Sequence, residues 1–206
     1  MGKLTAQDRE TYLYLRGLGI LKDVMPRKLP AEDAKRGMIL TCCADGDQFD
    51  DTYAHLAQAC LEYMPWPRIH PLPRMGGAIV IPRDSPLHRE HYGADLVQDI
   101  LDSYRIKEIS LVVLYAHAPC GAATKASLSL AQVLNWLAKA KVELKRTAES
   151  QKLPLKVACF VHIDRGAEEG RRTYFFPVGE WQLLTASHPV RPGEPWPPAL
   201  QKAARV

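Results

Sequence analysis

Four short apolar segments alternate along the chain with longer segments whose apolar residues recur at helical spacing, and this alternation limits the fold more than any other feature. The apolar segments, which we predict to be strands, are residues 37–43, 78–81, 109–115 and 156–163. Helices are predicted between them at about residues 48–64, 92–105 and 122–148. Crossover connections of a dozen residues or more join strands in parallel. The sequence therefore predicts an α/β fold with a mostly parallel sheet of about four strands and helices on both faces.

The two ends of the chain depart from this pattern. Thr5 to Asp8 has the order of a capping box, so we expect a helix that ends near Gly17 or Gly19 within an N-terminal helical arm of residues 1–35. Residues 172–178 can pair with residues 156–163 as an antiparallel edge hairpin. From Ser187 onward, five prolines fall within twelve residues, which predicts an extended Pro-rich tail over residues 187–206. The α/β domain itself is expected at residues 36–186.

Composition excludes several classes of protein. The net charge is only +4, and the basic residues are spread out without interleaved aromatic residues, so nucleic acid is not indicated as a partner. No apolar run approaches the roughly 20 residues that cross a bilayer. The first thirty residues carry charges throughout, unlike a signal peptide. We therefore expect a cytoplasmic protein with no membrane partner.

The five cysteines favour metal binding or catalysis over disulfides. Their number is odd, and most of them lie inside apolar runs. The expected roles differ by position: core positions for Cys42, Cys60 and Cys159, a strand position for His162, and surface positions for His55, His88 and His91.

Cys43, His117 and Cys120 are the candidates for a metal site. Cys43 ends one expected strand, and His117 and Cys120 follow another. Because the carboxyl ends of parallel strands lie at the same edge of a sheet, we expect the three side chains to meet there. One imidazole and two thiolates suit zinc and leave its fourth position for water or substrate. Asp45 is either a turn residue or a carboxylate that orients zinc-bound hydroxide toward an electrophile.

These residues carry a family resemblance. Cys43-Ala44-Asp45, followed by His117-Ala118-Pro119-Cys120-Gly121, resembles the Cys-x-Asp-x-Arg and His-x-x-Cys-Gly signatures of β-class carbonic anhydrases. Arg74 to Gly77 resembles the family's Arg-Asn-Ala-Gly turn, and Val157 to Phe176 is similar to its last strand pair, so the resemblance spans about residues 36–178. It implies a four-stranded parallel core with an antiparallel edge strand, a zinc cofactor, and a homodimer or a dimer of dimers.

The activity that the resemblance implies is the reversible hydration of carbon dioxide. In the mechanism that the resemblance implies, zinc-bound hydroxide attacks the carbon, and Asp45 orients the hydroxide. The spacing from Cys43 to His117 is longer than the family's, which makes a similar small electrophile an alternative substrate. The implied substrate pocket contains Asp47, Arg74, Gly76, Gly77 and Gly121.

The chain departs from the family signature at Asp47, where the signature has an arginine that fixes the aspartate. A second carboxylate cannot form that ion pair. Either Asp45 turns onto zinc as a fourth ligand, or another cation such as Arg74 or Arg83 takes over. Two other functions stay open: a zinc-binding homologue without normal activity, and a metal-free hydrolase in which Cys120 is the nucleophile.

Overall fold

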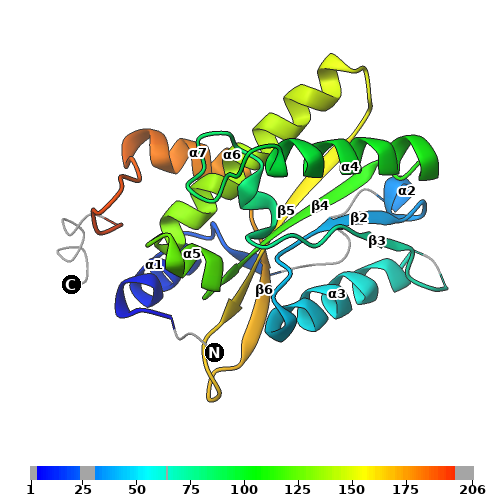
Figure 1. Cartoon of the computed structure of the whole chain (residues 1–206). Helices are drawn as coiled ribbons and strands as arrows, with labels where there is room; N and C mark the ends of the chain where they lie inside the picture. Colours follow the sequence, from blue (N-terminus) through cyan, green and yellow to red (C-terminus); the bar gives the residue numbers. More distant parts are fainter. Residues whose placement is uncertain (1–3, 24–30, 64, 198–206) are drawn as a thin grey trace.

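The computed structural model describes residues 4–23, 31–63 and 65–197, and its centre is one six-stranded sheet in the order β1-β6-β5-β4-β2-β3 (Figure 1). Strands β2 (Met38–Thr41), β3 (Ile69–Pro71), β4 (Leu111–Ala118) and β5 (Lys156–Asp164) run parallel. Strand β6 (Arg171–Phe175) pairs antiparallel with β5, and β1 (Lys22–Asp23) pairs antiparallel with β6. The predicted α/β fold with a mostly parallel sheet and an antiparallel edge is therefore confirmed, with β1 as an additional strand.

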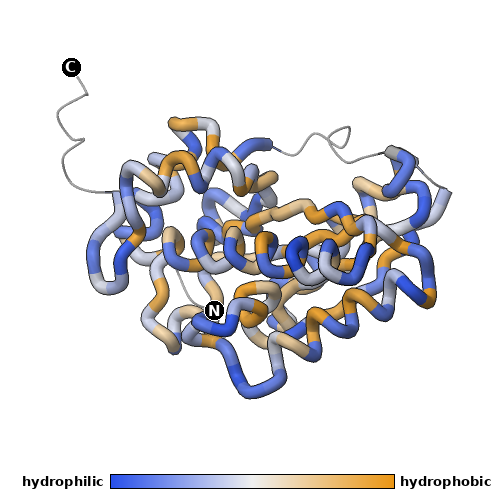
Figure 2. The backbone as a smooth tube through the Cα atoms, turned by 90° about the horizontal axis from the view of Figure 1, so that it is seen from above, coloured by the Kyte–Doolittle hydropathy of each residue, from blue (hydrophilic) through white to orange (hydrophobic). Residues whose placement is uncertain are grey.

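Helices cover both faces of the sheet. On one face, α3 (Gly46–Leu61) and the short α2 (Ala31–Ala34) pack over the side chains of Val113, Tyr115 and Phe160. On the other face lie α1 (Ala6–Gly17), α4 (Tyr92–Lys107), α6 (Leu130–Ser150) and α7 (Val178–Ser187). Hydrophilic and hydrophobic residues alternate along these helices in Figure 2, as expected of elements with one buried side. All eight residues of β4 are buried, because this strand lies in the middle of the sheet.

The apolar run at residues 78–81 is not a strand, and this prediction was wrong. Residues Gly77–Val80 form a 3₁₀ helix, η2. Gly76 and Gly77 both have positive φ, at 88° and 60°, and this pair turns the chain before the run can extend. The strand in this part of the chain is β3, which comes earlier and contains only three residues.

Two predicted helices have different bounds in the structure. The helix predicted at residues 48–64 is α3, which ends at Leu61, and residue 64 lies outside the described residues. The helix predicted at residues 122–148 is divided into α5 (Gly121–Lys125) and α6. Ser129 starts α6 as a capping box with Gln132, which explains the division.

Both ends of the described chain pack against the sheet domain. In α1, the Tyr12 hydroxyl lies 2.7 Å from that of Tyr174 on β6. Near the other end, Trp196 is only 3% exposed, and its ring centroid lies 5.2 Å from that of Trp181 on α7. The Gln7 amide donates to the carbonyl oxygen of Trp196 at 2.8 Å, so the two ends also contact each other. None of the helices in the described part of the chain is long and apolar enough to span a membrane.

Candidate metal centre

Cys43, His117 and Cys120 come together at the carboxyl edge of the parallel strands. Cys43 follows β2, His117 is the last residue but one of β4, and Cys120 precedes the first residue of α5. One ligand atom from each of the three residues lies within 4.8 Å of the other two. The strand order explains the meeting, because β2 and β4 are neighbours with Thr41 paired to Leu114.

The three side chains are buried and fit a metal ion. Their exposed fractions are 9% for Cys43, 4% for His117 and 5% for Cys120. Neither ring nitrogen of His117 has a hydrogen-bond partner among the described residues, although buried imidazoles are normally bonded. A divalent cation between two thiolates and this imidazole would satisfy the orphaned nitrogen, and the ligand set is one that zinc prefers.

The two sulfurs differ in how readily they lose a proton. The hydrogen bond from the Cys43 thiol, against the opposing effect of burial and with a smaller contribution from His117, lowers the pKa of Cys120 to about 4. The same hydrogen bond, together with burial, raises the pKa of Cys43. The backbone N–H of Gly76 donates to the Cys43 sulfur at 3.3 Å, which favours its thiolate. The site therefore holds one thiolate readily, and a bound cation would favour the second.

Asp45 borders this group of ligands. It is the N-cap of α3, and one carboxylate oxygen accepts a hydrogen bond from the backbone N–H of Asp47 at 3.0 Å. Its other oxygen lies 3.9 Å from His117 Nε2, which is too long for a hydrogen bond. Asp45 is not in the group of mutually close ligand atoms. Its carboxylate is thus beside the three ligands and anchored to the start of α3.

A hollow of about 370 Å³ opens next to the site. Its walls come from α3 and from the segment that carries Cys120: Asp45, Asp47, Gln48, Pro119, Gly121, Thr124 and Lys125. Asp47 and Gly121, which the resemblance placed in a substrate pocket, both line it. The hollow lies beside a buried group that could hold a metal, which is the arrangement that an open-site metalloenzyme needs.

Gly76, Gly77 and Arg74, the other three residues expected in the pocket, contact Cys43 instead of lining the hollow. Gly76 donates to the Cys43 sulfur. A Cβ atom on Gly77 would lie 2.8 Å from the Cys43 backbone nitrogen and 3.1 Å from the Tyr115 carbonyl oxygen, so only glycine fits there. The Arg74 guanidinium donates to Asp99 at 2.6 Å, and its backbone pairs with Cys43. None of the three is among the residues that line the hollow.

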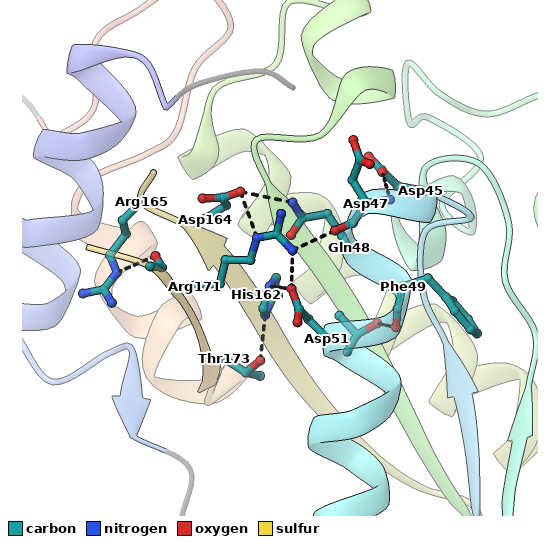
Figure 3. Close-up of polar contacts among 12 residues, drawn as sticks. Asp45, Asp47, Gln48, Phe49, Asp51, His162, Asp164, Arg165, Arg171 and Thr173 are labelled. Carbon is teal, nitrogen blue, oxygen red and sulfur yellow. Dashed lines mark hydrogen bonds and ion pairs between the residues drawn. The ribbon is translucent and has the colours of Figure 1, made fainter. Parts of the chain in front are cut away.

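Neither Arg74 nor Arg83 is paired with Asp45 among the described residues. Arg74 is paired with Asp99 on α4. Arg83 lies in a different hollow, together with His88 and Glu90. Asp47, which stands where the family signature has arginine, is exposed. The cation that does bind this part of α3 is Arg171 on β6, which donates to the Asp47 carbonyl oxygen at 2.9 Å (Figure 3).

The remaining cysteines and histidines are mostly where the sequence predicts them. Cys42, Cys60 and Cys159 are core residues, and burial raises their pKa values to about 12, 11 and 12. His162 lies in β5 and His91 is exposed. The predicted surface positions of His55 and His88 were wrong, because both are half-buried. His55 lies on the sheet side of α3, where Nδ1 is 2.5 Å from the Tyr115 hydroxyl, and His88 Nδ1 lies 3.2 Å from the Val80 carbonyl oxygen.

Sequence reasoning missed four residues of the hollow. One of them, Pro119, lies between His117 and Cys120 in the predicted ligand motif. Gln48 lies one helical turn after Asp45, a spacing that places both at the start of the same helix. Thr124 and Lys125 follow Cys120 within the short helix α5. Helical spacing from Asp45 could have found Gln48, and proximity to Cys120 could have found Thr124 and Lys125.

The fold and these side chains define an α/β protein with a buried Cys/His/Cys group that could hold a metal ion. No family model matches the chain, and no curated protein matches its sequence. Among solved structures, the chain is similar to a mutant of CafD, a β-carbonic anhydrase of the filamentous fungus Aspergillus fumigatus. The TM-score is 0.45 at 12% identity, covering 76% of this chain and 98% of that one. The functional proposal therefore depends on the residues of the site.

Proposed function

We propose that the chain is a zinc-dependent enzyme of the β-carbonic anhydrase type, which adds water to carbon dioxide or to a similar small electrophile. The observation that carries the proposal is the meeting of Cys43, His117 and Cys120 within 4.8 Å, with both nitrogens of His117 unpartnered among the described residues. Zinc bound there would act as a Lewis acid that makes water a nucleophile near neutral pH.

The chain's own residues would complete the chemistry. Asp45 presents a carboxylate oxygen beside the ligands, and that oxygen can accept a hydrogen bond from the attacking water and so fix its orientation. The hydrogen bond from the Asp47 N–H keeps this carboxylate in place. The hollow admits the substrate against Gly121, which has no side chain to block it. Burial of the three ligands keeps bulk water from competing for the metal.

Metal content and turnover test the proposal together. Purified protein should contain about one zinc per chain, and stopped-flow measurements should show carbon dioxide hydration above the buffer rate. Cys120→Ala should lose both the zinc and the hydration. Cys60→Ala is the matched control, because it removes an equally buried thiol from the core on α3 and leaves the ligands intact. Asp45→Asn should keep the zinc and lower kcat/KM by about 10²-fold.

Each contrary result identifies a different function. Zinc-loaded protein without hydration would indicate a binding protein or a different electrophile. Protein that is free of zinc, yet is inactivated toward an ester substrate by Cys120→Ala, would indicate a cysteine hydrolase. In that case the lowered pKa of Cys120 would supply the nucleophile.

A further inference from the structure

We infer that Arg171 is a positioning residue for the Asp45 carboxylate, and that it takes over the task of the arginine that Asp47 replaces. The inference rests on the proposed function, because the position of Asp45 matters through the site beside it. Arg171 begins β6, far from Asp45 in sequence, and its side chain extends across β5 to the first turns of α3 (Figure 3).

The guanidinium of Arg171 joins three elements. Its Nη1 atom donates to the carbonyl oxygen of Asp47 at 2.9 Å and to the carboxylate of Asp51 at 2.5 Å, both on α3. Its Nε atom donates to the carboxylate of Asp164, the last residue of β5, at 3.2 Å. In the described part of the chain, no other arginine or lysine is hydrogen-bonded or ion-paired to residues 45–51. Arg171 is thus the cation that holds the start of α3 to the sheet.

The first turn of α3 passes this restraint to Asp45. The backbone N–H of Asp47 donates to the Asp45 carboxylate at 3.0 Å, while the carbonyl oxygen of the same Asp47 accepts from Arg171. The backbone N–H groups of Gln48 and Phe49 donate to the Asp45 carbonyl oxygen at 3.1 and 2.9 Å. A shift of the Asp47 peptide groups would therefore move the Asp45 carboxylate with them.

Asp164 fixes Arg171 in turn. It is 8% exposed, and it also accepts from the Gly166 N–H at 2.9 Å and from the Gln48 amide at 3.4 Å. A buried carboxylate is stable only with such partners, so Asp164 and Arg171 hold each other in one geometry. Gln48 is 3% exposed and lines the hollow, so the network reaches the wall of the candidate site. Arg171 therefore does not contact the Asp45 carboxylate directly, and acts on it through the backbone of the first turn of α3.

Three variants test this role. Arg171→Gln removes the charge, Arg171→Lys keeps the charge but loses the forked geometry, and Arg172→Gln is the matched control. Arg172 is the next residue of β6, pairs with Asp23 at 2.9 Å, and has no bond to α3. All three are compared with the unchanged chain.

The first readout is amide hydrogen exchange in the metal-free protein. We expect Arg171→Gln to speed exchange at Asp47, Gln48 and Phe49 by about tenfold relative to the rest of α3. Arg171→Lys should have a smaller effect, and Arg172→Gln none. A merely structural role would instead speed exchange evenly along α3. Such an even rise, or a change no larger than in Arg172→Gln, would overturn the inference.

The second readout is the visible absorption spectrum of the cobalt-loaded protein. Loosening of Asp45 in Arg171→Gln should change the ligand field, and adding Asp45→Asn should abolish that change. A spectral change that persists in the double variant would count against the role of Asp45. The exchange readout needs neither metal nor turnover. If Arg171→Gln shows the local exchange effect but the unchanged chain hydrates neither carbon dioxide nor a similar small electrophile, the proposed function fails and the positioning role stands. If the unchanged chain shows hydration but Arg171→Gln shows no local exchange effect, the positioning role fails and the proposed function stands.

Discussion

Gly77→Ala should lower the free energy of unfolding more than an alanine substitution at a glycine that also has positive φ but has open space around its Cα atom, such as Gly19. Gly77 begins η2 and lies against the end of β2, with φ at +60°. An added Cβ atom would lie 2.8 Å from the Cys43 nitrogen, 3.0 Å from the Cys42 carbonyl carbon and 3.1 Å from the Tyr115 carbonyl oxygen. All three are backbone atoms of strands or their ends, so none can give way by a rotamer change.

Two contributions lower the free energy of unfolding of Gly77→Ala, and a smaller one raises it. A left-handed φ costs an alanine roughly 1 kcal/mol relative to glycine. Forcing an extra carbon into a closely packed site costs about 1–3 kcal/mol more, because the backbone must shift. Alanine lowers the entropy of the unfolded chain, which recovers about 0.5 kcal/mol. We expect the free energy of unfolding to fall by about 1.5–3.5 kcal/mol. The zinc affinity should fall about tenfold because Cys43 moves.

Gly19→Ala separates the two contributions. Gly19 has φ at +69°, and nothing lies within 4 Å of its added Cβ atom, so this variant carries the backbone strain alone. Urea unfolding of both metal-free variants, followed by circular dichroism, should give a loss for Gly19→Ala of only about 0.5 kcal/mol, which is the backbone strain less the same entropy gain. Competition with a chromophoric chelator gives the zinc affinity. Equal losses in the two variants would show that the close approach of Gly77 to the strands is not a constraint.

Three further predictions concern the tail, the pH dependence and the metal. Trp196→Ala should lower the free energy of unfolding in urea by about 3 kcal/mol, because its buried ring packs on Trp181; a loss below about 1 kcal/mol would contradict that packing. Burial lowers the pKa of His162 to about 4, so between pH 6.5 and 4 the unfolded chain binds the proton first. Through His162 alone, metal-free protein should then lose up to about 3 kcal/mol as the pH falls through this window. In urea titrations at each pH, His162→Gln should remove that part of the slope and leave the part due to His55, whose pKa burial also lowers to about 4. One equivalent of zinc should raise the Tm of chelator-treated protein in calorimetry, and Cys43→Ala should abolish the rise.

The parallel core could be predicted from the sequence because its strongest elements carry long, unbroken signals. β4 is eight buried residues in succession, and the run at 156–163 matches β5 to within a residue. The weak elements could not be predicted. β1 has two residues and β3 has three, one of them a proline, so neither leaves a detectable apolar period. The run at 78–81 has the composition of a strand, and the positive φ of Gly76 and Gly77 overrides it.

The same difference in signal applies to the candidate site. Cys43 and His117 could be placed together because each lies at the end of a strand in a parallel sheet, and strand ends fix an edge. The support behind them could not be placed. Gly76 reaches the Cys43 sulfur through its backbone N–H, and backbone donors carry no residue-type signal. Gly77 is recognisable as a constraint only when the distance to the Cys43 backbone is known.

Arg171 shows why the presence of a functional site cannot be decided from one departure from a sequence motif. Along the chain, Asp47 in place of arginine indicates that Asp45 has lost its cation. In space, the register of the β5–β6 hairpin pairs Asp164 with Arg171 at the carboxyl end of β5, which is the edge where α3 begins. Parallel strands bring many distant segments to this one edge, so a cation can arrive from any of them. The absence of an arginine two residues after Asp45 therefore does not by itself argue against the proposed function, because Arg171 on the hairpin reaches the start of α3.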